Sequence, residues 1–169
     1  MPAEHSADNS MFTDPRVAGA VELIWREARL LDKRAYEEWE KLWAPGGHYV
    51  IPIDPDTTDF ESTLNLVYDD DRMRRMRVER LTGGHSISAS AAATTVRTVS
   101  GFVVESSAAD RVRLTSAQVL VAHKRSATTV LAAELTHEVE FSPAGPALAL
   151  KVVRLVNARE AVTAPGYLL

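Results

Sequence analysis

The stretch "LAAELTHEVEF", residues 131–141, alternates between two kinds of side chain along its whole length. One set of alternate residues is apolar apart from His137, and it runs from Leu131 to Phe141. The residues between them include Glu134 and Glu138. Because successive side chains of a strand point to opposite faces, this pattern predicts a strand with one packed face and one solvated face. Such a strand is typical of an antiparallel sheet that is covered on one side only.

The neighbouring segments extend the same kind of sheet. Four long strands are predicted near the end of the sequence, at about 94–105, 111–124, 127–141 and 147–157. The segments "SSAAD", "KRSA" and "SPAGPA" separate them and are short enough to be hairpin connections. Two shorter β-rich runs come earlier, "HYVIPI" at 48–53 and "TLNLVY" at 63–68. An antiparallel meander is the simplest arrangement of these strands.

Helical patterns dominate the first third of the chain. Asp14 and Pro15 are typical of an N-cap followed by the first helical residue. Apolar residues then recur at helical spacing, at Val17, Val21, Ile24, Ala28 and Leu31. A second helix is predicted at about 34–43, with an aromatic face and with "PGG" at 45–47 ending it. Helices followed by a meander indicate an α+β fold, with the first helix lying across a curved sheet.

Composition restricts the possible functions. The chain has 169 residues, no cysteine and a formal net charge of −4. General binding to nucleic acid needs a dominant basic face, so we expect no nucleic-acid partner. The start of the sequence lacks the features of a signal peptide, and no apolar run is long enough for a membrane span. We therefore expect a cytoplasmic protein, with a flexible arm at residues 1–13 and a single domain at 14–169.

The densest charged segment is "YDDDRMRRMRVERL", residues 68–81. It predicts a helix from about Asp71, with its acids at the N-terminal end, where the helix dipole favours negative charge. A packing face is predicted from Met73, Met76 and Leu81. Arg77 and Arg80 project among these residues on a helical wheel. They are predicted to pair with internal acids or to reach a partner's acids at an interface, unless they are ordinary surface arginines.

Several of these segments occur together in a known family. "LLDKRAYEEWEKLW", "HYVIPI", "YDDDRMRRMRVERL" and "VRTVSGFVVE" stand in its order and spacing. Over about residues 14–160 the sequence resembles the small (beta) subunit of aromatic-ring-hydroxylating, Rieske-type dioxygenases, which have the cone-shaped α+β fold of the NTF2-like (SnoaL-like) superfamily. The family pattern has an asparagine where this chain has Gly101.

The resemblance implies a structural rather than a catalytic role. Beta subunits of this family assemble with a large alpha subunit, typically as three alpha and three beta chains. The large subunit carries the Rieske 2Fe–2S cluster and the mononuclear iron, so no cofactor or metal is expected in this chain. The five histidines are scattered along the sequence and form no recognisable ligand cluster.

Related members of the same superfamily suggest an alternative function. Lyases, isomerases and cyclases with this fold pair an aspartate with a histidine as a general base inside the cone. Asp32 matches that aspartate, but Arg97 stands where the histidine is normally found. Arginine cannot act as a base at working pH, so Asp32 and Arg97 are predicted to form a structural ion pair inside the cone.

Two other histidines could restore such a base. His137 lies on the packed face of its predicted strand, and His85 follows "TGG" in a predicted loop. Either could act with Asp32 on a small hydrophobic substrate. The competing interpretations are a hydrogen-bonded core histidine for His137 and an exposed loop residue for His85. A third possibility is a ligand-binding module with the same cone and no catalysis.

Overall fold

Three helices and six strands form the part of the chain that the structure, a computed structural model, describes: residues 13–83, 92–158, 160 and 167–169. Nearly all of the predicted N-terminal arm and His85 lie outside these residues. The helices are α1 (Pro15–Asp32), α2 (Tyr36–Glu40) and α3 (Asp71–Thr82). The strands are β1 (Trp43–Pro52), β2 (Asn65–Asp69), β3 (Thr94–Ser107), β4 (Arg111–Lys124), β5 (Ala127–Ser142) and β6 (Gly145–Leu155).

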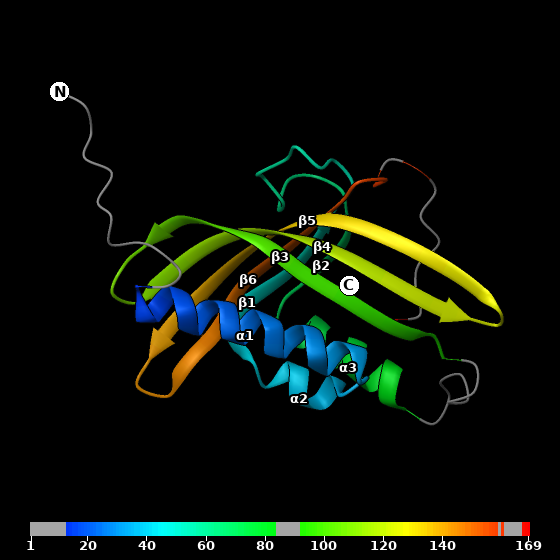
Figure 1. Ribbon diagram of the computed structural model, residues 1–169, viewed down its shortest axis with the longest axis horizontal. Coiled ribbons are helices and arrows are strands. Elements are labelled where there is room, and N and C mark those ends of the chain that lie inside the picture. Colours follow the sequence, from blue (N-terminus) through cyan, green and yellow to red (C-terminus); the bar gives the residue numbers. More distant parts are fainter. Residues whose placement is uncertain (1–12, 84–91, 159, 161–166) are drawn as a thin grey trace.

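The strands form one sheet in the order β2-β1-β6-β5-β4-β3. Neighbouring strands are antiparallel except for β1 and β6, which pair in parallel. Figure 1 shows that the long strands curve strongly and that α1 runs across them, with α2 next to α1 and α3 next to α2. The predicted α+β fold, with N-terminal helices on a curved and mainly antiparallel sheet, is confirmed.

The long first helix begins where its sequence signals predict. The Asp14 side chain accepts a hydrogen bond from the backbone N–H of Arg16 at 2.9 Å, and Pro15 is the first helical residue. This cap satisfies one of the donors that every helix N-terminus leaves free. The buried face of α1 then packs on the sheet; its residues are Val17, Ala20, Val21, Leu23, Ile24, Glu27, Ala28 and Leu31.

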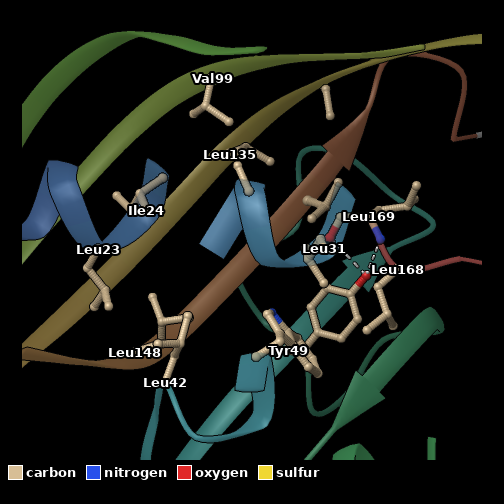
Figure 2. Close-up of a cluster of buried hydrophobic side chains, with 14 of the residues drawn as sticks. Leu23, Ile24, Leu31, Leu42, Tyr49, Val99, Leu135, Leu148, Leu168 and Leu169 are labelled. Carbon is tan, nitrogen blue, oxygen red and sulfur yellow. Dashed lines mark hydrogen bonds between the residues drawn. The ribbon is translucent and has the colours of Figure 1, made fainter. Parts of the chain in front are cut away.

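The inner face of the sheet supplies the other half of the core. On β5, Ala133, Leu135, His137 and Val139 are all buried, which confirms the predicted packing face. Figure 2 shows Leu135 and Leu148 of the sheet with Leu23, Ile24 and Leu31 of α1 in one cluster of buried side chains. Leu168 and Leu169, far along the chain, belong to this same cluster.

The predicted helix at 34–43 was wrong at its C-terminal end. Helix α2 ends at Glu40, and Trp43 already begins strand β1, which continues through "PGG". The backbone N–H of Leu148 on β6 donates to the carbonyl of Leu42 at 2.8 Å, so pairing with β6 starts at this point. Gly46, with a φ of 77°, lies where the register between the two strands shifts. The glycines therefore shape a bulge in a strand rather than ending a helix.

Gly101 also occupies a bulge. The register between β3 and β4 shifts between Ser100 and Val103, and Gly101 has a φ of 67°. Glycine adopts this backbone conformation without steric cost, and asparagine tolerates it better than most residues. Either residue can therefore adopt the backbone conformation of this bulge.

The predicted packing face of α3 was right for Leu81, which packs against the core, but wrong for the two methionines. Met73 and Met76 are 41% and 44% exposed, whereas Arg74 and Val78 are buried. Arg74 is covered because it finds partners on three sides: it hydrogen-bonds the carbonyl of Gly47, donates to Asp71 at 2.6 Å, and its guanidinium lies 4.2 Å from the centre of the Trp43 ring. Arginine's planar, weakly hydrated head suits such a buried and stacked position.

Candidate functional site

Asp32 and Arg97 lie together inside the fold. Arg97 Nε donates to Asp32 Oδ1 at 2.8 Å, and the backbone N–H of Arg97 donates to Oδ2 at 3.0 Å. The hydroxyl of Thr95 donates to Oδ1 at 3.0 Å. Both carboxylate oxygens are therefore engaged by protein donors, and the neighbour is a permanently protonated guanidinium. This arrangement ties the end of α1 to β3 and leaves Asp32 poorly placed to orient a catalytic histidine.

His137 lies in a different group of polar residues, together with Glu27. His137 is fully buried on β5, and its Nε2 lies 3.2 Å from Glu27 Oε2 of α1. Among the described residues no hydrogen bond joins His137 to Asp32 directly. The structure thus brings Asp32 together with Arg97, and His137 together with an acid that the sequence analysis did not anticipate.

Lys151 completes this buried group. Its Nζ donates to Glu27 Oε1 at 2.7 Å and to the main-chain oxygen of Leu169 at 2.8 Å. Trp39 Nε1 donates to the same Glu27 oxygen at 3.0 Å. On the sheet, Tyr49 of β1 pairs with Lys151 of β6, which pairs with His137 of β5. Three polar side chains therefore stand in a row across the sheet.

The pKa directions follow from burial and charge. Burial alone would raise the pKa of Glu27, but the Lys151 ammonium and the hydrogen bond from His137 hold it well below its usual range. Burial lowers the pKa of His137, and Glu27 opposes this only in part. Burial also lowers the pKa of Lys151, again opposed by Glu27. His137 is therefore a neutral imidazole at neutral pH, and Lys151 Nζ lies at the 2.7 Å distance of an ion pair from the Glu27 carboxylate.

The lowered pKa of His137 predicts that the protein loses stability in mild acid. Because the pKa of His137 is lowered from the 6.5 of the unfolded chain, the unfolded state binds a proton at pH values where the folded state does not. Stability should therefore fall as the pH drops below that value, with a slope of up to about 1.4 kcal/mol per pH unit. Urea unfolding of the wild type and of His137→Gln, measured from pH 7 to pH 5, tests this expectation.

The matched control is His123→Gln, because His123 is an exposed histidine on the same sheet. Its pH profile should follow that of the wild type, whereas the profile of His137→Gln should be flatter. Parallel profiles for the wild type and both variants would contradict the assignment of a buried neutral imidazole to His137.

The arginines of α3 have two different surroundings. Arg77 donates to buried Asp69 through Nε at 2.5 Å and through Nη2 at 3.0 Å, and its side chain stays 28% exposed. The hydrogen bond that Arg77 donates to Asp69 raises the pKa of Arg77. Arg80 is exposed, and within the described part of the chain it donates only to the carbonyl of Met76, at 3.4 Å. Arg77 thus pairs with an internal acid, while Arg80 faces solvent with Met73 and Met76.

A groove of about 420 Å³ lies at the start of α3. Its lining residues are Glu40, Lys41, Trp43, Ala44, Pro45, Asp71, Arg74 and Arg75. The described residues contain no cluster of three or more acidic or histidine side chains that could hold a metal ion. Nor does any helix among them combine the length and apolar character needed to cross a membrane.

Sequence reasoning missed Glu27, Lys151 and the two C-terminal leucines. Glu27 stands at helical spacing with Leu23, Ile24 and Leu31, on the face of α1 that packs. A charged residue in the middle of an apolar stripe is a usable signal for a buried partner. Lys151 interrupts the apolar run "ALALKVVRLV" in the same way. Nothing in the sequence indicates that Glu27 and Lys151, 124 positions apart, pair with each other.

Comparison with known proteins places the chain in a family. Residues 26–159 match the family model described as ring hydroxylating beta subunit. The beta subunit of benzoate 1,2-dioxygenase from Burkholderia mallei is similar in structure, with a TM-score of 0.73, 18% identity, and coverage of 89% of this chain and 96% of that one. A naphthalene 1,2-dioxygenase structure matches with a TM-score of 0.71, 17% identity, and coverage of 88% and 81%.

The fold extends beyond dioxygenase subunits. A putative scytalone dehydratase from Novosphingobium aromaticivorans matches with a TM-score of 0.63 at 9% identity, covering 83% of this chain and 84% of that one. No curated protein sequence matches the chain. Identities this low show a shared fold only, whereas the family model covers most of the sequence. The chain belongs to the family of beta subunits of ring-hydroxylating dioxygenases.

Proposed function

We propose that this chain is a non-catalytic structural subunit that holds the large subunit of an aromatic-ring-hydroxylating dioxygenase in its assembly. The assembly would act in the cytoplasm and carry out O₂-dependent dihydroxylation of an aromatic ring. Membership in the family supports this function. The observation that supports it within the chain is the Asp32–Arg97 ion pair, at the two positions where the resemblance to superfamily enzymes would require a catalytic aspartate and histidine.

The cofactors of the reaction would belong to the large subunit. A Rieske cluster is held by two cysteines and two histidines, and this chain has no cysteine. The 2Fe–2S cluster and the mononuclear iron are therefore proposed for the partner. The stoichiometry proposed is three alpha and three beta chains, with the beta chains forming a trimer.

The alternative, a lyase, isomerase or cyclase of the same superfamily, is less well supported by the geometry. Its strongest support is the His137–Glu27 pair, which resembles a general base with an orienting acid. However, His137 has no exposed surface, and Asp32 is engaged with Arg97 and Thr95. A substrate would need a path to His137, and the residues that the structure describes leave no part of this side chain exposed.

The outer face of α3 is the surface we propose for the large subunit. Arg80 and the half-exposed methionines Met73 and Met76 lie on it. Arg77 contributes its remaining exposed part, while its bond to Asp69 fixes the direction of the guanidinium. Arginines next to flexible apolar side chains are typical of protein interfaces, where they meet acids of the partner.

A second uncovered surface, here named the valine patch, suits contacts between beta chains. It consists of Val96, Val121 and Val130, which are 64%, 39% and 61% exposed and are directly paired across β3, β4 and β5. These side chains carry no charge, so burying them against another copy has no electrostatic cost. In a closed trimer each contact is head-to-tail, so this patch on one chain would meet a different surface of the next chain, and the contact would repeat around the ring.

Variants of the outer face of α3 and of the valine patch should have different effects on assembly. The tagged chain should recover a stoichiometric larger protein with a Rieske-type Cys/His sequence from its native host. Met76→Glu combined with Arg80→Glu should weaken that association at least about 30-fold, as expected for interface hot spots, while the beta trimer persists. Val121→Glu combined with Val130→Glu should dissociate the trimer instead. Sedimentation and co-purification measure both effects.

Each double variant serves as the control for the other. Circular dichroism should show that both are folded, since all four substituted side chains are exposed or partly exposed. If the wild type is recovered without any larger protein, the proposed function is wrong. If the α3 variant binds the large subunit as well as the wild type does, the interface lies elsewhere.

A further inference from the structure

The sheet has two edge strands, β2 and β3, and side chains of α1 cap the free side of β3. Helix α1 packs along β3 (Figure 1). The carboxylate of Asp32 accepts a hydrogen bond from the backbone N–H of Arg97 at 3.0 Å. The indole of Trp25 donates to the carbonyl of Val99, also at 3.0 Å. Main-chain groups that a further strand would need are therefore already bonded, and the bulge at Gly101 interrupts the same edge.

The free side of β2 carries no comparable cap in the part of the chain that the structure describes. Strand β2 pairs with β1 on one side. On its other side, no strand or side chain among the described residues bonds the main chain of Asn65–Asp69. An edge strand turns alternate N–H and C=O groups outward, where they are a template for another strand. Strand β2 therefore offers main-chain donors and acceptors to another polypeptide.

The side chains of this edge are apolar where edge strands usually carry charge. Leu64, just before β2, is 80% exposed, and Leu66 within it is 44% exposed. The ring of Tyr68 is stacked on that of His48, with the centroids 5.2 Å apart. From Leu64 to Tyr68 there is no charged residue and no proline, which are the residues that protect exposed edges from pairing. Both the main chain and the side chains of β2 therefore suit an added strand with apolar residues.

Symmetry and the cap on β3 argue against a second copy of this chain as the added strand. Two copies paired through β2 would form a two-fold dimer, which does not fit a trimer of beta chains. A ring would need β2 of one copy to pair with β3 of the next, but Asp32 and Trp25 occupy the free side of β3. The added strand therefore belongs to a different polypeptide.

The position of β2 indicates which polypeptide this is. Strand β2 ends at Asp69, and α3 begins two residues later at Asp71. Arg77 of α3 forms an ion pair with Asp69, so the strand and the helix are joined directly. The edge of β2 thus adjoins the helix whose outer face we assign to the large subunit.

We propose that an extended segment of the large subunit pairs with β2 and becomes a further strand of the sheet. Its main chain bonds the outward N–H and C=O groups of β2, and its apolar side chains at alternate positions cover Leu64 and Leu66. Such a segment is recognised by its extended backbone and its apolar pattern rather than by charge. This inference rests on the proposed function, which supplies the large subunit, and adds the element through which the two chains join.

Hydrogen exchange measures main-chain pairing directly. The isolated wild-type chain and the complex recovered with the large subunit should be compared in D₂O, with the amides of residues 65–69 resolved by fragmentation mass spectrometry. The amides of β2 that do not bond β1 should exchange rapidly in the isolated chain and about 100-fold more slowly in the complex. The amides of β4, a strand paired on both sides, should exchange slowly in both samples and serve as the internal control.

A charge placed on this edge should weaken the association. Leu66→Lys should reduce the affinity for the large subunit about tenfold, because a lysine on an edge strand opposes the approach of an apolar strand. Val103→Lys is the matched control, since Val103 is a 59% exposed residue of the other edge strand, and its affinity should equal that of the wild type. Circular dichroism should show that both variants are folded.

The possible outcomes separate this inference from the proposed function. Rapid exchange of all β2 amides in a complex that does form would overturn the added strand and leave the proposed function intact. Wild-type affinity of a folded Leu66→Lys variant would do the same. Slow exchange of these amides in the isolated chain that depends on its concentration would mean that copies pair with each other, and would overturn the choice of partner. Recovery of no larger protein would overturn both proposals.

Discussion

Replacing Glu27 by glutamine should lower the free energy of unfolding by about 3–5 kcal/mol, the cost typical of breaking one side of a buried ion pair. Glutamine keeps the size and shape of the side chain, so the change removes charge rather than volume. The Lys151 ammonium, 1% exposed, would then lie 2.7 Å from an uncharged group. Urea unfolding at fixed protein concentration measures the effect, with the midpoint shifting while the m-value stays constant.

The chain offers a matched control in Glu38→Gln. Glu38 also bonds a lysine, Lys41, at 3.0 Å, but both side chains are more than half exposed. Exposed pairs of this kind contribute at most about 1 kcal/mol, so this variant should unfold almost like the wild type. Adding Lys151→Met to Glu27→Gln should recover part of the loss, since no buried charge is then left unpaired. Equal effects of Glu27→Gln and Glu38→Gln would refute the buried pair.

The sheet could be predicted from the sequence because its strands alternate. The predicted boundaries of 111–124 and 127–141 agree closely with β4 (Arg111–Lys124) and β5 (Ala127–Ser142). A half-buried antiparallel strand imposes a period of two on its residues, and the hairpin segments set the ends. The start of α1 was predictable for a similar local reason, because Asp14 and Pro15 satisfy the needs of a helix N-terminus by themselves.

Predictions failed where contacts between residues far apart in the sequence determine the local structure. The residues "PGG" at 45–47 normally end a helix, but here they pair with β6 and form a bulge in β1. On α3 the methionines seemed to be the packing residues, yet Arg74 is buried instead, because the carbonyl of Gly47 and the ring of Trp43 lie in reach. From sequence alone an arginine is expected at the surface. The Gly47 carbonyl and the Trp43 ring, which allow Arg74 to be buried, belong to another part of the chain.

In the candidate site too, local sequence signals identify some residues, whereas other contacts arise only from the fold. The Asp32–Arg97 contact was inferred by matching positions in a superfamily, since nothing local indicates that residues 65 positions apart meet. Glu27 is different, because its place among the apolar residues of α1 marks it as buried, although not which cation it meets. The binding of Leu168 and Leu169 inside the fold depends on the register that aligns Tyr49 with Lys151. That register exists only in the folded sheet, so the sequence alone does not indicate it.

Replacing Trp39 by alanine should cost about 3–5 kcal/mol of stability, comparable to other deletions of large aromatic side chains from a core. Trp39 is completely buried, and the rings of Trp43 and Tyr49 pack edge-on against it at centroid distances of 5.5 and 5.8 Å. Its removal would leave a cavity between α2 and the sheet and would take one hydrogen bond from Glu27. Urea unfolding with a constant m-value is again the measurement.

Trp25→Ala is the matched control, because Trp25 also has an edge-on ring partner, Phe102, and an indole hydrogen bond, to the carbonyl of Val99. Trp25 is 48% exposed, so its loss leaves a surface depression rather than a cavity and should cost about 1 kcal/mol. Trp39→Phe should fall between the two, since it keeps most of the volume but loses the indole N–H. If Trp39→Ala and Trp25→Ala destabilise equally, Trp39 does not anchor the core that positions Glu27 and Tyr49.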